Sequence, residues 1–403
     1  MITRKKGFYI ERDILLILRK VSEEIGIKSY IVGGYIRDKI LNLESNDIDV
    51  TVEGDGIKYA LMLNEFLNGE IEVHEKFKTA KIKADKYIID VVSARKEYYT
   101  HSGMLPNVEL ADIVEDIKRR DFTINMLAFD VKENKIIDLY NGLDDIKNKT
   151  IRVVHDKSFN DDPTRIFRAL RYSVRLDFKL EPHTELLLKQ SIANGDFDNL
   201  STDRIMNEIY LILSEKNPET IVKLMKHYRI DEKIFDGIKI NIRNLNTCVR
   251  CGDLLLYRFL LFFYNVKKDD LDYLNEKFNF KRQYTKGLSD LIEIKMNLYT
   301  LKDDIVVYNL FKDKKIEAIN AIYTMEGENI KKIVDRYFEV IKSLKLEING
   351  DDIKKLGLRP SPIYKKILDN IYYDKICGKI RSKEDEFERL KQYVEKVKRG
   401  EKI

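Results

Sequence analysis

The sequence predicts an α+β protein that begins with a small mixed sheet and continues as helices. Up to about residue 150, short β-branched runs alternate with turns and helical patterns, which indicates a mixed α/β part. From Asp162 onward, apolar residues recur at the helical period, interrupted by Gly, Asn or Pro. The chain has 403 residues, of which 44% are hydrophobic, so it can bury a core in each of roughly two to four domains.

Six runs in the first part are predicted strands, and three stretches between them have helical periodicity. The strands are expected at residues 29–32, 48–52, 71–74, 79–84, 87–92 and 136–139, and the helices at 11–24, 35–41 and 57–67. Asp85 and Lys86 fit a hairpin turn between two of the strands. Later helices are expected at 163–176, 184–191, 203–213, 218–227 and 254–264. Breaks in these patterns predict domains at 1–150, 151–217, 218–328 and 329–403.

Composition excludes several classes of protein. The net charge of +5 allows a basic groove without requiring one. No apolar run is long enough to span a bilayer, and residues 1–7 are basic without a following apolar core, so a cytoplasmic protein is expected. Cys248, Cys251 and Cys377 are too few for a disulfide framework and lack the further ligands of a zinc site. Ordinary buried thiols are therefore expected.

A pair of glycines marks a candidate phosphate site. Gly33 and Gly34 follow a predicted strand and precede a predicted helix, an arrangement that allows backbone amides to approach a phosphate. Arg37, in the first turn of that helix, adds a positive charge. A tight turn without a ligand is the alternative, and this segment alone does not decide between them.

Two aspartates form a candidate metal site. Asp47 and Asp49 lie two positions apart in a predicted strand, so their side chains face the same way while Ile48 faces the core. Paired carboxylates suit Mg²⁺, which keeps several waters and takes other ligands from substrate phosphates. Asp90, on another predicted strand, can complete the cluster for two-metal chemistry. The alternatives are an exposed strand with an acidic polar face and, for Asp90, a polar residue with internal partners.

Arginines gather in two further segments. Arg119 and Arg120 precede an apolar stretch read as a helix, where they form either a surface cap or a fork for phosphates and base edges. Asp162 is expected to cap the next helix, with Pro163 at its first position.

The helix after Pro163 has a charged stripe and an apolar stripe. The charged stripe consists of Arg165, Arg168, Arg171 and Arg175, and the apolar side of Ile166, Phe167, Leu170 and Val174. Like charges at this spacing repel one another, and no acids are interspersed. The stripe therefore predicts an anionic partner.

In this order, the motifs resemble those of class II CCA-adding tRNA nucleotidyltransferases, which share them with bacterial poly(A) polymerases. The resemblance rests on Gly33, Gly34, Arg37 and Asp38, on Asp47 and Asp49, on residues 119–125, and on Asp162, Arg165, Arg168 and Arg171. Residues 348–353 and 357–360 resemble the tail of the same family. The resemblance implies a nucleotidyltransferase head at 1–150, a nucleotide-selecting helical neck, a helical body and a tRNA-binding tail.

The resemblance also implies an activity, which is addition of CCA to the 3′ end of tRNA from CTP and ATP with Mg²⁺ as cofactor. No membrane or protein partner is implied. Carried over by position, Asp47 and Asp49 bind Mg²⁺ and form the catalytic set with Asp90, while Gly33, Gly34 and Arg37 contact the nucleotide and Arg120 positions it. Asp162 and Arg165 act as the protein's own template, with Arg168 and Arg171 nearby.

Four features depart from the family pattern or leave its products open. Asp161, Met126 and Ser361 stand where the family usually has Glu, Ala and Gly, and residues 155–160 resemble members that add only CC or only A. A CC-adding or A-adding specialist is therefore the first alternative, followed by a poly(A) polymerase. A non-catalytic RNA-binding relative is the remote alternative, because a binding module has no need of paired metal carboxylates.

Overall fold

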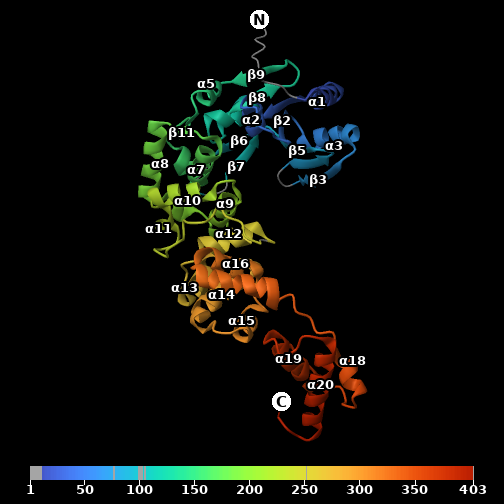
Figure 1. The fold of residues 1–403 in the computed structure, drawn as a ribbon. Helices are drawn as coiled ribbons and strands as arrows, with labels where there is room; N and C mark the ends of the chain where they lie inside the picture. Colours follow the sequence, from blue (N-terminus) through green and yellow to red (C-terminus); the bar gives the residue numbers. More distant parts are fainter. Residues whose placement is uncertain (1–10, 76–77, 99–102, 104–105, 251, 403) are drawn as a thin grey trace. The chain divides into compact units, whose positions relative to one another are not determined.

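The computed structural model describes residues 11–75, 78–98, 103, 106–250 and 252–402. The chain divides into two compact units, Met1–Asp236 and Gly237–Ile403. Strands lie in the N-terminal half of the chain and helices make up the rest (Figure 1), so the predicted α+β class is confirmed. Helices α10 (Pro218–His227) and α11 (Ile230–Ile234) belong to the first unit, although the sequence predicts a boundary before them. The finer division into neck, body and tail stays a prediction.

Seven strands form the central sheet of the first unit, in the order β3-β4-β5-β2-β1-β8-β9. Their bounds are β1 (Lys28–Val32), β2 (Asp47–Glu53), β3 (Glu70–His74), β4 (Thr79–Ala84), β5 (Tyr87–Ser93), β8 (Leu127–Asp130) and β9 (Lys135–Asp138). β2 and β5 are parallel, and the other neighbouring pairs are antiparallel, so the sheet is mixed as predicted. Two short ribbons pair β6 (Arg95–Tyr98) with β7 (Asn107–Leu110) and β10 (Thr150–Ile151) with β11 (Lys179–Leu180).

The alternation of residues in β2 determines what each face of the sheet carries. Ile48 and Val50 are at most 1% exposed, on the face against which α1 (Arg12–Ile25) and α3 (Gly56–Leu67) pack. On the other face, Tyr30 and Val32 pack against α4 (Ile113–Lys118). Asp47 and Asp49 share this second face and are exposed, since the hydrophobic cover does not extend over them.

The other helices of the first unit are α2 (Gly34–Ile40), α5 (Gly142–Lys147), α6 (Ser158–Asp161), α7 (Thr164–Leu176), α8 (Pro182–Asn194) and α9 (Thr202–Ser214). The second unit contains α12 (Leu254–Phe262), α13 (Lys268–Phe278), α14 (Arg282–Asn297), α15 (Asp304–Phe311), α16 (Ile316–Met325), α17 (Glu328–Arg336), α18 (Gly350–Lys355), α19 (Ile363–Ile376) and α20 (Lys383–Lys398). A π-helical turn, Tyr337–Ile341, follows α17.

One predicted element is wrong. The apolar stretch after Arg120 is not a helix but a short 3₁₀ turn, Thr123–Asn125, followed by strand β8. β8 pairs with β1, with Val32 opposite Ala128. Pairing in the sheet decides the conformation, because four residues are too few for their apolar pattern to distinguish a strand from a helix.

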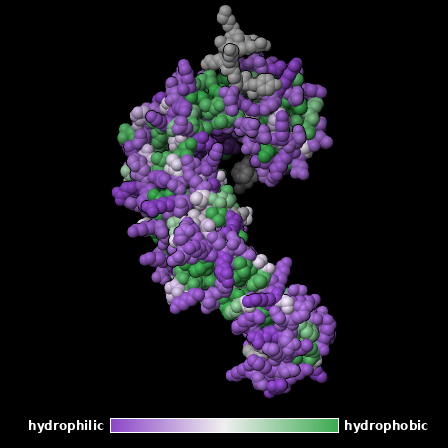
Figure 2. All heavy atoms as spheres, viewed as in Figure 1, coloured by the Kyte–Doolittle hydropathy of each residue, from purple (hydrophilic) through white to green (hydrophobic). Residues whose placement is uncertain are grey.

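Hydrophilic residues cover most of the face seen in Figure 2, as expected when 35% of the residues are charged. Within the described ranges, no helix combines the length and the apolar character needed to cross a bilayer. Cys248 and Cys377 are exposed, so the expectation of buried thiols is wrong for both, and Cys251 lies outside the described residues.

An aromatic cluster around Phe259 of α12 stabilises the second unit. The ring centroid of Phe259 lies 4.6 Å from that of Tyr284 and 5.2 Å from that of Phe280. Phe259→Ala is expected to lower the free energy of unfolding of this unit by about 3–5 kcal/mol, because the change removes a fully buried ring. Urea unfolding measures the loss. Leu254→Ala, on the same helix but 39% exposed, is the matched control, and equal losses in the two variants would refute the assignment.

Candidate active site

The predicted carboxylates of β2 and β5 lie beside the end of strand β1. Val32 pairs with Asp49 of β2, and Asp49 pairs with Asp90 of β5. Residues directly opposite one another in neighbouring strands project from the same face, so Asp49 and Asp90 are neighbours. Asp47 lies on that face two positions before Asp49. The strand register therefore brings all three predicted carboxylates to one face of the sheet.

The turn after β1 requires glycine. Gly33 has a φ of +70°, a conformation that disfavours other residues. A Cβ atom at Gly33 would lie 2.8 Å from Arg120 Nη1 and 3.6 Å from Asp49 Oδ2. The backbone therefore lies directly against both side chains, and Gly34 begins α2 immediately afterwards.

The three carboxylates are accessible but electrostatically crowded. Lys81 Nζ lies 3.2 Å from Asp90 Oδ2. Desolvation by the surrounding protein raises the pKa of Asp49. The positive charge of Arg120 opposes this rise, and the negative charges of Asp90 and Asp47 increase it. No three His, Cys, Asp or Glu side chains in the described part of the chain are arranged to hold a metal ion by themselves.

A buried carboxylate holds both arginines of the predicted pair. Asp116 is 0% exposed and accepts hydrogen bonds from Arg119 Nε (3.0 Å) and Nη2 (2.8 Å) and from Arg120 Nη2 (2.9 Å). Burial opposes ionisation of Asp116, but Arg120 and Arg119 outweigh it and lower its pKa. The side chains of Arg119 and Arg120 are 17% and 16% exposed, so the surface-cap interpretation is wrong.

A second network links α2 to α7. Arg37 is 3% exposed, and its Nη1 donates to Asn125 Oδ1 (2.5 Å). Asn125 Nδ2 donates to Asp121 Oδ1 (3.0 Å), and Arg168 Nε donates to Asp121 Oδ2 (2.7 Å). The ring of Tyr172 lies beside the guanidinium groups of Arg37 (5.2 Å) and Arg168 (5.6 Å). Arg37 is thus fixed by protein partners.

The start of α7 differs by one residue from the prediction. The helix begins at Thr164, with Pro163 as its cap residue. Asp162 still caps the backbone, because its Oδ1 accepts from Thr164 N (3.1 Å). The same oxygen accepts from Arg204 Nη2 of α9 (2.7 Å), a partner that the sequence does not reveal.

Arg165 connects α7 to the segment before β8. It is 5% exposed, and its Nη1 donates to Ser158 Oγ (2.7 Å). Its Nη2 donates to the carbonyl oxygen of Arg119 (2.9 Å). The predicted base-reading arginine is therefore bonded to the chain next to Arg120.

The arginine stripe of α7 has acidic partners on α9 and just after it. Arg171 Nη1 donates to Glu208 Oε2 (3.1 Å), and Arg171 Nε donates to Glu215 Oε1 (3.2 Å). Arg175 Nε donates to Glu215 Oε2 (3.0 Å). The premise that the charges of these two arginines lack acidic partners is therefore wrong, because the acids come from another element. The predicted contact of Arg171 with a nucleotide stays a prediction.

The glycine turn after β1, the arginine pair and the start of α7 line a polar cavity of about 410 Å³ in the first unit. Eight predicted site residues line it, namely Gly33, Gly34, Arg37, Asp49, Arg120, Asp162, Arg165 and Arg168. Asp47, Asp90 and Arg171 are not among the lining residues. Arg119 and Arg175, which belong to the two predicted arginine segments, also line it. The lining residues for which no role was predicted are Glu97, Asp121, Asn125, Thr164, Tyr172 and Glu208.

The unpredicted residues differ in how far the sequence could have shown them. Asp116 stands three and four positions before Arg119 and Arg120, the spacing of ion pairs on a helix, so it was detectable. Arg204 bonds Asp162, 42 positions away in the sequence, and Glu208 bonds Arg171, 37 positions away. No local pattern in the sequence indicates either contact.

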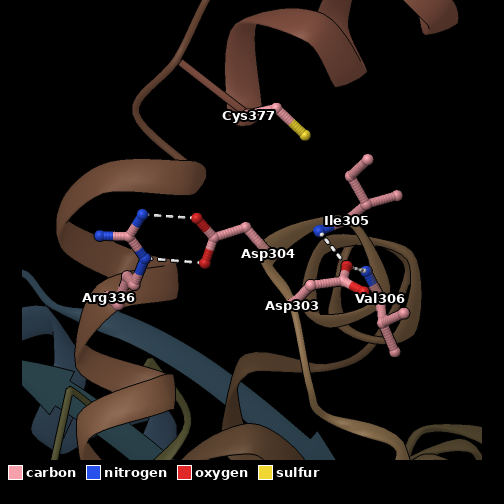
Figure 3. A pocket seen from close by; sticks show the side chains of 6 residues that line it. All are labelled: Asp303, Asp304, Ile305, Val306, Arg336 and Cys377. Carbon is pink, nitrogen blue, oxygen red and sulfur yellow. Dashed lines mark hydrogen bonds and ion pairs between the residues drawn. The ribbon is translucent and has the colours of Figure 1, made fainter. Parts of the chain in front are cut away.

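The second unit has a cavity of about 600 Å³ that contains none of the predicted residues. Figure 3 shows the carboxylate of Asp304 facing the guanidinium of Arg336, with Nε to Oδ1 at 2.7 Å. Asp303 accepts hydrogen bonds from the first backbone amides of α15. Of the charged groups of this cavity, Asp304 and Arg336 are thus paired with each other, and Asp303 caps α15.

A mixed-sheet head with aspartates beside a glycine turn, joined to helices that complete its pocket, defines a nucleotidyltransferase-type fold. A family model described as the Poly A polymerase head domain matches residues 29–152. A second, described as the probable RNA and SrmB-binding site of polymerase A, matches residues 177–240. The chain belongs to the tRNA nucleotidyltransferase and poly(A) polymerase family, as the motif order predicts.

Relatives cover the chain to different extents. It is 31% identical to the A-adding tRNA nucleotidyltransferase of Geobacter sulfurreducens over 94% of its own length and 47% of that protein. Identity to the A-adding enzyme of Halalkalibacterium halodurans is 25%, over 95% and 93% of the two chains. The solved Thermotoga maritima CCA-adding enzyme, complexed with tRNA, is 27% identical over 96% and 95%, with a TM-score of 0.73. The chain thus spans about half the length of the Geobacter protein.

The contact of Asp121 with Arg168 predicts a pH-dependent contribution to stability. Burial opposes ionisation of Asp121, but Arg168 and Asn125 outweigh it, so its pKa is lowered. Asp121→Asn is expected to destabilise the first unit by about 2 kcal/mol at neutral pH, because its amide nitrogen faces Arg168. A lowered pKa contributes stability above the unfolded value of about 3.9 and loses it as pH falls through the folded value.

Urea unfolding of the wild type and Asp121→Asn at a series of pH values measures this contribution. The difference between the two proteins should shrink below about pH 4. A difference that stays constant down to acid pH would contradict an ionised Asp121.

Proposed function

We propose that this protein transfers nucleotides from ATP and CTP to the 3′ end of tRNA without a nucleic-acid template. The observation that carries the proposal is the shared cavity, in which Gly33 and Asp49 lie with Asp162 and Arg165. The first pair belongs to the sheet and suits a triphosphate, and the second belongs to the start of α7 and suits a base. In the reaction, the 3′-hydroxyl oxygen of tRNA attacks the α-phosphorus, and pyrophosphate leaves.

The carboxylates fit Mg²⁺. Asp47 and Asp49 supply hard oxygen ligands from one face, and substrate phosphates and water can complete the coordination. When bound, Mg²⁺ activates the attacking hydroxyl and neutralises charge on the triphosphate. Arg120 lies against Gly33 and beside Asp49, where its guanidinium can bind phosphate oxygens. Asp90 can act as a third carboxylate through Oδ1, because the ion pair with Lys81 engages Oδ2.

Selection of the base rests on complementary hydrogen bonding. Asp162 offers acceptors, and Arg165 offers donors. Cytosine and adenine both present an exocyclic amino donor beside a ring acceptor, so one Asp–Arg pair can match either after a small shift. Asp162 Oδ1 and one N–H of each Arg165 Nη already have protein partners. We infer that Asp162 Oδ2 and the remaining N–H groups of Arg165 contact the base.

The names of the relatives support two different products. Addition of the full CCA is the leading proposal from the motif pattern, and the name of the tRNA-bound Thermotoga relative agrees with it. Addition of A alone is the second, favoured by the names of the Geobacter and Halalkalibacterium relatives. Both use the same site, and we infer that either acts in the cytoplasm.

Extension of tRNA distinguishes these products. Purified protein and Mg²⁺ are incubated with tRNA ending at the discriminator base, after CC, or complete, together with CTP, ATP or both. Growth by three nucleotides that then stops supports CCA addition. Growth by two on the bare end supports a CC-adding specialist, and growth by one on the CC form alone supports A addition. Unbounded A addition would make the protein a poly(A) polymerase, and no addition to any form would contradict the proposal.

Asp49 provides a test of the metal-binding role. Asp49→Asn is expected to lower nucleotide transfer at least about 100-fold, because removal of one stabilising group from an active site has effects of this size. Binding of tRNA, measured by filter retention, should change little. Glu72→Gln, an exposed acid on edge strand β3, is the control and should retain full activity. Transfer near the wild-type rate in Asp49→Asn would refute the metal-binding role.

Arg165 provides a test of base selection. Arg165→Ala is expected to reduce the preference for the correct nucleotide about tenfold, as expected for the loss of one charge-assisted hydrogen bond, with little change in triphosphate affinity. Single-turnover rates with each nucleotide measure the preference. Arg19→Ala is the matched control, since Arg19 also donates to a backbone carbonyl, that of Val131, away from the cavity. Unchanged preference in Arg165→Ala would contradict the template role.

A further inference from the structure

We propose that Asp116 is a positioning residue that sets the place of both Arg120 and Arg165 in the cavity. The proposal rests on the proposed function and adds a residue that contacts no substrate. Asp116 lies in α4, is 0% exposed and does not line the cavity itself. It acts through the two arginines that follow α4.

On the sheet side, Asp116 fixes Arg120. Within the described structure, the side-chain hydrogen bond of Arg120 goes from Nη2 to Asp116 Oδ2 (2.9 Å), and Arg120 Nε has no partner. Arg120 Nη1 lies against Gly33, beside Asp49. The position of this guanidinium therefore depends on Asp116, because no other hydrogen bond in the described ranges restrains it.

On the α7 side, Asp116 acts through Arg119. Its Oδ1 accepts from Arg119 Nε (3.0 Å) and Nη2 (2.8 Å), and Glu97 Oε1 accepts from Arg119 Nη1 (2.9 Å), so Asp116 makes two of the bonds that hold this guanidinium. The carbonyl oxygen of Arg119 accepts from Arg165 Nη2 (2.9 Å). A change in the arginine pair is therefore transmitted to the residue that we propose reads the base.

Asp145 shows what a purely structural role would look like. It is 5% exposed and accepts from Thr123 Oγ1 (2.6 Å) and Arg152 Nε (3.1 Å), but it does not line the cavity. Replacement of either aspartate by asparagine removes a buried charge from an arginine and should lower stability. The positioning role predicts that only the Asp116 variant alters nucleotide handling.

The test compares full-length Asp116→Asn and Asp145→Asn. Melting temperature, ATP affinity without tRNA, KM and kcat for ATP, and nucleotide preference are measured for both. We expect lower melting temperatures in both variants. Asp116→Asn should raise the KM and Kd for ATP about tenfold and reduce nucleotide preference at least fivefold, as for about one lost charge-assisted hydrogen bond, while Asp145→Asn stays within about twofold. Equal changes in the two variants would overturn the proposal.

Two further outcomes keep the test decisive. If the wild type binds ATP but adds no nucleotide to tRNA, the proposed function fails, and the difference in ATP affinity still decides the role of Asp116. If Asp116→Asn does not fold by circular dichroism, Arg119→Lys replaces it, because it removes the fork that bonds Asp116 Oδ1, together with the bond to Glu97, and leaves Asp116 and Arg120 in place. Arg119→Lys should reduce nucleotide preference at least threefold, and an unchanged preference would overturn the proposal.

Discussion

The hydrogen bond from Arg165 to the carbonyl oxygen of Arg119 joins α7 to the segment that carries Arg120, and so connects the two walls of the cavity. One wall of the cavity comes from the sheet and the opposite wall from the start of α7. Other buried contacts fix both residues of this bond. Arg165 also bonds Ser158, and the side chain of Arg119 bonds Asp116. The bond therefore fixes the distance between the proposed phosphate-binding and base-reading groups.

Six arginines line the cavity, and their mutual repulsion would open it without acidic partners. Asp116, Asp121 and Glu215 provide such partners, each within hydrogen-bond distance of at least one of these arginines. Such pairing orients the guanidinium groups before a substrate arrives, so less ordering remains to be done on binding. Asp49 and Asp162 keep oxygen atoms for other partners, which fits their proposed contacts with metal and base.

Local patterns in the sequence predicted six of the seven strands of the central sheet and the shared face of Asp47 and Asp49, because both follow from side-chain alternation. They also predicted the need for glycine at position 33 and a cap at Asp162. The conformation of β8 was not predictable, since four apolar residues become a strand only by pairing with β1. The pairing of Arg171 and Arg175 with acids of another segment, and of Asp90 with Lys81 across two strands, required the tertiary fold. The part of the fold that depends on local periodicity was thus accessible, and the charge pairing of the site was not.

Photocrosslinking with an azidoadenine analogue of ATP tests the central claim most directly, namely that one cavity holds the triphosphate and reads the base. The full chain is irradiated with the analogue in the presence and absence of excess ATP, and labelled peptides are identified by mass spectrometry. The account predicts ATP-protected labelling of α7 and the residues just before it, within residues 158–175. Protected labelling confined to Gly237–Ile403, where the second cavity lies, would contradict it.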